Sequence, residues 1–211
     1  MTKEREVLNG YGSLCDLGSD LAVLILHPWG LLGGNRNNAV VCTVASYFQR
    51  GHKFTTLRMD FQGYQIGWGY SELKQVQEAS KCILEETAAS KILIVGYSYG
   101  SIVGASAASD ISECVGYIMI APPFAVSHWL FLFRSSYHLN RAKESTCRNL
   151  LLIGTKDNFT TTEYFQDQAN EFQQDMTVTK LIDDADHFFI GFEIEIIKHI
   201  DEWVRTKILC K

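Results

Sequence analysis

The chain has 211 residues, of which 46% are hydrophobic and 20% are charged, and its formal net charge at pH 7 is −5. Lysine and arginine do not cluster along it, so the basic surface that nucleic acids require is missing and we expect no nucleic-acid partner. A chain of this size hides roughly 70% of its unfolded surface on folding. The length and composition therefore predict a single domain over residues 1–211 that needs no disulfides.

Cysteine usage and hydropathy indicate the compartment. The six cysteines are scattered, without a C-x-x-C pair, and most lie within apolar or helical runs. That usage is typical of a reducing compartment. The first apolar run, 21–26, is too short for a signal-peptide core or a membrane span. We therefore expect a cytoplasmic protein that does not insert stably into a membrane.

In chain order, apolar segments alternate with helical patterns. Asn9-Gly10 predicts the turn of an antiparallel hairpin at the start. The predicted strands are 21–26, 53–59, 92–95, 114–120, 148–153 and 176–182. The predicted helices are 36–50, one that begins at 71, 101–108, 160–174 and 194–207. Strands that are apolar throughout and alternate with helices predict an α/β fold, a mostly parallel sheet with helices on both faces.

Residues 122–146 interrupt this alternation. Their first part is rich in aromatic residues and their second part is polar. Because they follow a predicted strand, they lie at the sheet edge that borders the active-site crevice in open α/β sheets. Two interpretations remain open. The segment is a short lid with an apolar underside, or a crossover helix that packs its aromatic side chains on the sheet.

Residues 96–100, GYSYG, place a serine between a predicted strand and a predicted helix. Strand, G-x-S-x-G and helix form the context of a nucleophile elbow, a sharp turn that exposes the serine. Glycine is needed at both ends of the pentapeptide because a Cβ there would clash with the neighbouring elements. The pattern indicates that Ser98 is a nucleophile. The alternative is a Gly/Ser-rich turn without chemistry.

A serine hydroxyl becomes a nucleophile only when a base removes its proton, and the base needs an orienting partner. Asp157 follows the predicted strand 148–153, and His187 follows the next one. The order Ser98, Asp157, His187, each after its own strand, is the order found in α/β-hydrolases. Each residue also has a plainer interpretation, since Asp157 could cap a helix and His187 could lie on the surface. One histidine among acidic residues lacks the ligand spacing of a metal site, so we expect no metal at Asp183, Asp184 and Asp186.

The third requirement is an oxyanion hole, a pair of N–H groups that stabilises the negative oxygen of the intermediate. One donor is the N–H of Tyr99, directly after the elbow serine. The other comes from the glycine-rich loop 27–34 after the first apolar strand. Pro28 has no N–H, so we expect Trp29 to supply it, with Gly30 as the second choice.

Together these motifs make the chain resemble a small α/β-hydrolase. The matching segments are His27-Pro28 with Gly33-Gly34, LRMDFQG at 57–63, GYSYG at 96–100, GTKD at 154–157 and DHFF at 186–189. The resemblance implies an α/β-hydrolase fold with a short or minimal lid and a serine hydrolase that cleaves an ester-like acyl substrate, as a carboxylesterase or thioesterase. No cofactor is implied, because a triad performs acyl transfer without one.

Aromatic residues near the motifs suggest the substrate class. We expect the pocket to be lined by Tyr97, Tyr64, Trp68, Phe124, Trp129, Phe159 and Phe188. Such a lining favours a small-molecule apolar acyl or aryl ester over a charged substrate. Two other functions remain open. A hydrolase fold can serve as a non-catalytic binding protein or scaffold, and the apolar stretch 128–133 could act at a lipid surface.

Overall fold

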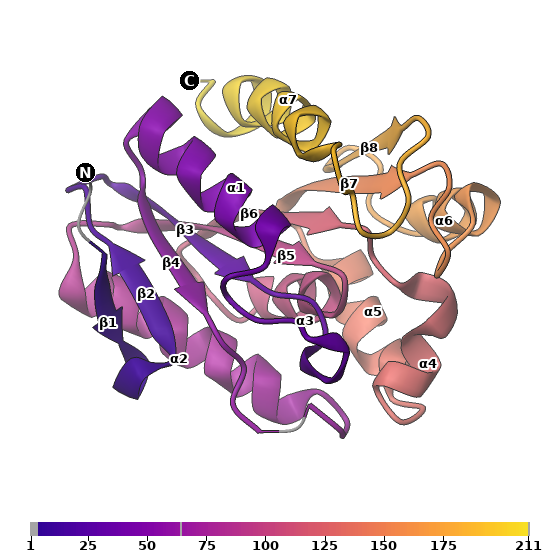
Figure 1. Ribbon diagram of the computed structural model, residues 1–211, viewed down its shortest axis with the longest axis horizontal. Helices are drawn as coiled ribbons and strands as arrows, with labels where there is room; N and C mark the ends of the chain where they lie inside the picture. The colour runs from indigo at the N-terminus through magenta and orange to yellow at the C-terminus, as the bar shows by residue number, and fades with distance from the viewer. Residues whose placement is uncertain (1–3, 64, 211) are drawn as a thin grey trace.

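The centre of the computed structural model, which describes residues 4–63 and 65–210, is an eight-stranded sheet with helices on both faces (Figure 1). The strand order is β1-β2-β4-β3-β5-β6-β7-β8. The strands are β1 (Arg5–Val7), β2 (Gly12–Cys15), β3 (Leu21–Leu26), β4 (Thr55–Met59), β5 (Lys91–Tyr97), β6 (Cys114–Ile120), β7 (Arg148–Gly154) and β8 (Thr177–Ile182). The last six strands are parallel, while β1 and β2 form an antiparallel hairpin at one edge. The predicted α/β sheet is confirmed.

The helices form two layers. The α-helices are α1 (Ala39–Tyr47), α2 (Tyr70–Glu86), α3 (Tyr99–Ala108), α4 (Ser127–Leu130), α5 (Ser135–Glu144), α6 (Thr162–Ala169) and α7 (Glu193–Trp203). Helices α1 and α7 cover one face of the sheet, and α2, α3, α5 and α6 contribute to the core on the other. Within the described residues, none of the helices is long and apolar enough to cross a membrane.

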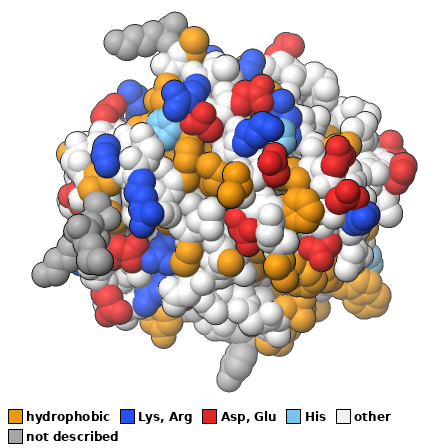
Figure 2. All heavy atoms as spheres, turned by 45° about the horizontal axis from the view of Figure 1, so that its top comes forward, with side chains coloured by type: hydrophobic (Ala, Val, Ile, Leu, Met, Phe, Trp, Pro, Cys, Tyr) orange, Lys and Arg blue, Asp and Glu red, His pale blue; other side chains and the backbone are white. Residues whose placement is uncertain are grey.

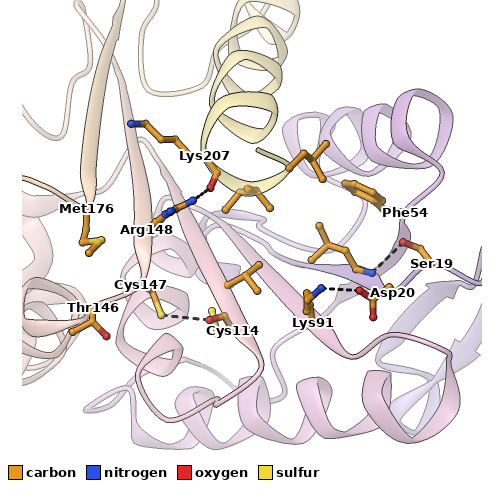
Figure 3. A pocket seen from close by; sticks show the side chains of 14 residues that line it. Ser19, Asp20, Phe54, Lys91, Cys114, Thr146, Cys147, Arg148, Met176 and Lys207 are labelled. Carbon is orange, nitrogen blue, oxygen red and sulfur yellow. Dashed lines mark hydrogen bonds and ion pairs between the residues drawn. The ribbon is translucent and has the colours of Figure 1, made fainter. Parts of the chain in front are cut away.

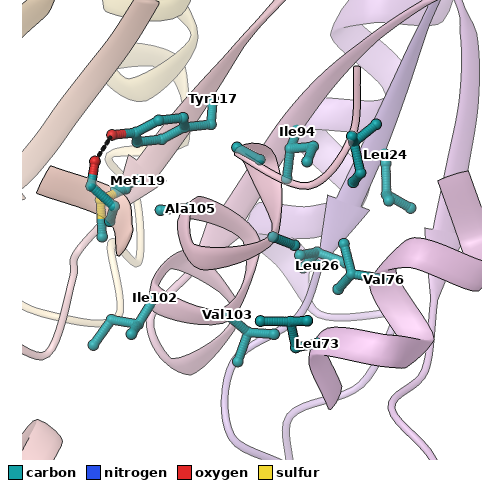
Figure 4. Packing of buried hydrophobic residues seen from close by; sticks show 14 of the residues in the cluster. Leu24, Leu26, Leu73, Val76, Ile94, Ile102, Val103, Ala105, Tyr117 and Met119 are labelled. Atoms are coloured by element: carbon teal, nitrogen blue, oxygen red, sulfur yellow. Dashed lines mark hydrogen bonds between the residues drawn. The ribbon is translucent and has the colours of Figure 1, made fainter. Parts of the chain in front are cut away.

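The central strands explain why both faces are covered. Every residue of β3 is buried, and successive side chains point to opposite sides. Leu24 and Ile94 pack with α2 and α3 in one core, whereas Val23 belongs to the core under α1 and α7. Figure 4 shows the first of these cores, where side chains of the sheet meet those of α2 and α3. A continuously apolar strand therefore requires a helical layer on each side.

Two helices begin later than predicted, because a side chain caps the first turn of each one. Helix α1 begins at Ala39 instead of residue 36, because the Asn38 side chain caps it by accepting from the Val40 N–H at 3.0 Å. Helix α6 begins at Thr162, where the Thr161 hydroxyl is the cap. The predicted hairpin is present and turns through Asn9, at a φ of 55°.

Segment 122–146 divides into two halves that lie in different places. Its second half is the crossover helix α5, which packs on α3 through the buried Leu139 and Ala142. The Nδ1 atom of His138 lies 3.0 Å from the Ser106 hydroxyl of α3. Its first half lies at the carboxyl end of the sheet and exposes Trp129 and Phe133. The polar half therefore behaves as an ordinary connection, and only the aromatic half can serve as a lid.

Candidate active site

The turn between β5 and α3 has the geometry of an elbow. Ser98 has φ 52° and ψ −120°, a left-handed conformation that costs a non-glycine residue free energy. A Cβ on Gly96 would lie 2.3 Å from the carbonyl oxygen of Gly100, and one on Gly100 would lie 2.5 Å from that of His27. Both glycines are therefore required by space. The Ser98 side chain points out of the turn toward the loop after β8.

A chain of hydrogen bonds joins the serine, the histidine and the aspartate. The Ser98 hydroxyl lies 2.9 Å from Nε2 of His187, and Nδ1 of His187 lies 2.7 Å from Oδ2 of Asp157. A carboxylate can only accept, so Nδ1 carries the proton and Nε2 is left to accept from the hydroxyl. Ser98 is 7% exposed, and the Asp157 side chain is fully buried. The sheet thus brings together three residues that lie far apart in the sequence.

The second carboxylate oxygen of Asp157 shapes its own loop. Oδ1 accepts from the N–H of Phe159 at 2.8 Å and from that of Thr160 at 3.0 Å. The Thr160 hydroxyl in turn donates to the carbonyl of Pro122 at 3.1 Å. Asp157 therefore accepts hydrogen bonds from its own turn through one oxygen and faces Nδ1 of His187 with the other. The same loop is tied to the start of segment 122–146.

The loop that carries His187 is fixed from two directions. Oδ1 of Asp186 accepts from the N–H groups of Phe188 and Phe189, which closes the turn after β8. From the end of β5, the hydroxyl of Tyr97 donates to the carbonyl of His187 at 2.8 Å. Burial and nearby carboxylates raise the pKa of Tyr97, so this hydroxyl stays protonated. Tyr97 is thus a positioning residue as well as part of the cavity wall.

The loop after β3 is held by His27, which belongs to one of the sequence motifs, and by Gln65, which the sequence does not single out. Nδ1 of His27 bonds the Pro28 carbonyl, and its Nε2 accepts from the N–H of Phe61 at 2.9 Å. Burial lowers the pKa of His27, which keeps the ring neutral in this bracing role. Gln65 accepts from the N–H of Gly30 at 2.6 Å through Oε1. That bond occupies the N–H of Gly30, which was the second choice from the sequence.

Two backbone N–H groups near Ser98 have no acceptor among the described residues. The N–H of Tyr99 begins α3, and the first four N–H groups of a helix have no acceptor within it. The N–H of Trp29 makes no hydrogen bond with another residue in 4–63 or 65–210. Trp29 itself is held through its indole N–H, which donates to the Gln65 carbonyl at 2.9 Å.

A cavity of about 370 Å³ opens above the serine. Its polar groups are few, and most of its wall is apolar. The predicted residues that line it are Trp29, Tyr97, Trp129, Phe159 and Phe188. Others that line it, which the sequence did not single out, are Leu32, Asn38, Pro123, Val126 and Leu130. The Phe159 ring lies 4.4 Å from the His187 ring, between centroids, and shields the imidazole from water.

Three predicted wall residues have a different outcome. Phe124 is not in the cavity wall; it is buried in the core, where its ring stacks on Phe165 of α6. Trp68 also lies away from the cavity, on the surface beneath the guanidinium of Arg134. Tyr64 falls outside the described residues. Both corrections have one cause: aromatic residues near a motif pack wherever their own element faces, and the sequence does not give that direction.

The acidic residues beside His187 each contact a different partner. Asp184 pairs with Lys156 at 2.8 Å, and Asp186 caps the turn. In the part of the chain that the structure describes, no group of three or more His, Cys, Asp or Glu side chains could hold a metal ion.

Comparisons with known proteins agree with this architecture. The sequence pattern of the alpha/beta hydrolase domain family matches residues 71–202. The uncharacterized protein RP471 of Rickettsia prowazekii is 24% identical over 193 residues, which cover 87% of this chain and 78% of that protein.

Solved structures share the fold. XC6422 of Xanthomonas campestris, described as an a/b serine hydrolase without lid, superposes with a TM-score of 0.75 at 20% identity, over 97% of this chain and 93% of that one. Est1E of Butyrivibrio proteoclasticus, with ferulic acid bound, has a TM-score of 0.82 at 12% identity, over 94% and 95% of the two chains.

Proposed function

The chain belongs to the alpha/beta hydrolase domain family, and from this premise we propose that it is a serine hydrolase that cleaves apolar acyl esters or thioesters. Membership makes it a hydrolase. The observation that carries the finer proposal is the hydrogen-bonded chain from Ser98 through His187 to Asp157. A hydroxyl, an imidazole and a buried carboxylate in this order are the parts of nucleophilic acyl transfer.

In the proposed reaction, Oγ of Ser98 attacks the substrate carbonyl while Nε2 of His187 takes its proton. The imidazolium that forms is stabilised by Asp157, whose Oδ2 already accepts from Nδ1. His187 then gives the proton to the leaving group, and an acyl-enzyme remains. A water molecule, deprotonated by the same imidazole, attacks the acyl-enzyme and releases the acid.

The oxyanion that appears in each step needs donors that are already in place. We assign this role to the N–H groups of Tyr99 and Trp29. Trp29 lines the cavity that contains Ser98, Tyr99 directly follows Ser98, and neither N–H has an acceptor among the described residues. Each donor of this kind lowers the barrier by about 2.7–4 kcal/mol. The elbow glycines and the Gln65 anchor keep the two donors in position.

The cavity wall supports an apolar acyl group. Phe159, Trp129 and Leu32 enclose it, and no Lys, Arg, Asp or Glu side chain is among the described residues that line it. An aromatic acyl group such as the ferulic acid bound by Est1E would find flat apolar partners here. The rim is strongly exposed: Trp129 is 64% and Phe188 49% accessible. A substrate with a longer apolar chain would cover this rim.

The exposed rim also favours a second candidate function, which is hydrolysis at a lipid surface. Figure 2 shows apolar side chains gathered toward the lower right of the face it draws, among charged ones. Segment 122–146 contributes Trp129, Leu132 and Phe133 to the exposed apolar surface. Co-sedimentation with neutral phosphatidylcholine liposomes, with Trp129→Ser as the control, separates this function from hydrolysis of dissolved esters.

A fluorophosphonate probe tests the proposed nucleophile. We expect the wild-type protein to be labelled, Ser98→Ala to lose all labelling, and Ser112→Ala, an exposed serine at the far end of α3, to label normally. Hydrolysis of p-nitrophenyl esters should fall by about 10⁶ in Ser98→Ala. A folded wild-type protein that neither labels nor hydrolyses esters of any chain length would make this a non-catalytic binding protein.

A further inference from the structure

A second cavity, of about 660 Å³, lies at the end of the sheet opposite Ser98. It is bordered by the first residues of β3, β5, β6 and β7 and is closed on one side by the turn after α7. Figure 3 shows Cys114, the first residue of β6, and Cys147, the residue before β7, in its wall, with a dashed line from the Cys147 sulfur to the Cys114 carbonyl oxygen. Both residues are partly exposed. The cavity therefore gives a small reagent access to a pair of cysteines.

The two thiols face the same side of the sheet. Cys114 and Cys147 both pack against the core under α2, α3 and α5. Val115, which follows Cys114, packs against the core under α1 and α7. The pairing of β5 with β6 is irregular between Cys114 and Gly116. The thiol of Cys147 lies 3.6 Å from the carbonyl of Cys114.

The spacing of the strands suits a disulfide. Arg148 pairs with Gly116, which places Cys147 one residue out of register with Cys114. Strands about 4.8 Å apart and an offset of about 3.3 Å put the two Cα atoms about 6 Å apart, inside the usual range of about 4.4–6.8 Å for a disulfide. Small side-chain rotations can therefore join the two sulfurs without moving the backbone.

The pair also has the electronic asymmetry that thiol oxidation requires. The neighbouring Cys114 and Ser145 side chains lower the pKa of Cys147 to about 6, whereas the neighbouring Cys147 and burial raise the pKa of Cys114. The two shifts favour a thiolate at Cys147 and a thiol at Cys114. The contrast within the chain is Cys82, where burial and Glu86 raise the pKa to about 11.

We propose that Cys114 and Cys147 form a redox-active dithiol, reached through the 660 Å³ cavity, which a hydroperoxide converts to a disulfide. The Cys147 thiolate attacks the terminal peroxide oxygen; the O–O bond breaks, an S–O bond forms, and the alkoxide leaves as the alcohol after taking a proton. The Cys114 sulfur then attacks the sulfenic sulfur, an S–S bond forms, the S–O bond breaks and water leaves with the Cys114 proton. Two thiols are oxidised by two electrons, and the hydroperoxide is reduced to alcohol and water.

The disulfide would close a loop that includes the entrance to the active site. Between Cys114 and Cys147 lie β6, the aromatic half of segment 122–146 with Trp129, and α5. Closing a loop restricts the unfolded chain and so stabilises the folded one. Oxidation thereby restrains, in the unfolded chain, the loop that contains this cavity-wall segment, and the folded protein becomes more stable.

Peptide mapping of the wild-type protein tests the dithiol. The protein is treated with hydrogen peroxide at neutral pH, denatured, alkylated and digested. We expect one new species, the Cys114 and Cys147 peptides joined with the loss of two hydrogen atoms, which a reductant reverses. The oxidised protein should also have a higher Tm than the reduced one. A map in which both cysteines remain alkylated, or in which Cys147 is joined to Cys210, overturns the proposal.

Variants separate the two roles. In Cys114→Ser the resolving thiol is missing, so Cys147 should accumulate as a sulfenic acid that dimedone traps. Cys147→Ser should give neither a linked peptide nor a dimedone adduct at Cys114, while Cys82→Ser, the matched control, should form the link as the wild type does. Dimedone labelling of Cys114 in place of Cys147 would refute the assignment of the nucleophile. An unchanged Tm in linked protein would refute the restraint on the loop.

Discussion

The two ends of the sheet each carry a cavity, but their polar groups are organised differently. At the amino end, charged groups pair locally on the rim: Asp20 with Lys91 at 2.9 Å, and the Arg148 guanidinium with the Lys207 carbonyl. At the carboxyl end, Ser98, His187 and Asp157 come from three different strands and form one continuous chain. The amino-end cavity is the larger of the two, about 660 Å³ against about 370 Å³.

The difference shows that volume alone does not locate the chemistry. In parallel sheets the loops after the strands can be varied and converge on one crevice. There the backbone can be strained, as at Ser98, because surrounding hydrogen bonds enforce the strain. The residues at the amino end begin strands, so their backbone is fixed by the sheet. Paired variants at the two ends test this contrast.

Among the paired variants, the largest effect is expected when the charge of the buried Asp157 is removed. In Asp157→Asn the amide oxygen can still accept from the Phe159 and Thr160 N–H groups. The amide nitrogen, however, donates to Nδ1 of His187, so the imidazole proton moves to Nε2, which can then no longer accept from Ser98. We expect kcat for ester hydrolysis to fall by about 10⁴ in Asp157→Asn. Asp20→Asn, at the other end, should leave kcat unchanged. Equal losses in both variants would contradict the contrast between the two ends.

Two buried tyrosines offer a matched pair with a smaller effect. The hydroxyls of Tyr97 and Tyr117 each donate to a backbone carbonyl at 2.8 Å, that of His187 and that of Ala142 respectively. Both Phe variants lose one hydrogen bond, worth about 1 kcal/mol of stability. In Tyr97→Phe the loss also loosens the catalytic loop, so we expect kcat to fall about fivefold with KM unchanged. Tyr117→Phe should lower Tm alone; a similar fall in its kcat would make the effect of Tyr97 merely structural.

The smallest effect is a pH dependence of stability. Burial lowers the pKa of His27 in the folded protein below its ordinary value of 6.5, so the unfolded chain binds the proton more tightly. Stability from the neutral ring is fully present above pH 6.5 and is lost as the pH falls below it. We expect Tm to fall less between pH 7 and pH 5 in His27→Gln than in the wild type. Parallel Tm curves for the two proteins would exclude His27 as a source of this dependence.

The sheet was predictable because its signals are local. Continuously apolar strands such as Leu21–Leu26 and the glycines of GYSYG fix the elements, and the chain order of Ser98, Asp157 and His187 follows from strand ends. The contacts among these three residues are long-range, but parallel topology leaves them little freedom. The geometry at these positions is therefore the part of the site that the sequence predicts best.

The cavity wall was less predictable because it depends on side-chain direction. Phe124 follows a strand just as Phe159 does, yet one packs against α6 and the other on His187. Gln65 and Asn38 have no motif, and their roles appear only when distant loops meet. The pair Cys114 and Cys147 depends on an irregularity in strand pairing, which leaves no trace in hydropathy.

The hydrogen bond from Thr160 to the Pro122 carbonyl has a consequence for redesign of the substrate range. It joins the turn that holds Asp157 to the first residue of the entrance segment, so the Asp157 carboxylate and the start of that segment are mechanically coupled. Insertions or grafted loops placed at 122–124 would pull on Asp157. The exposed turn at Leu132 and Phe133 lies beyond this anchor, and new loops can be grafted there without disturbing the acid.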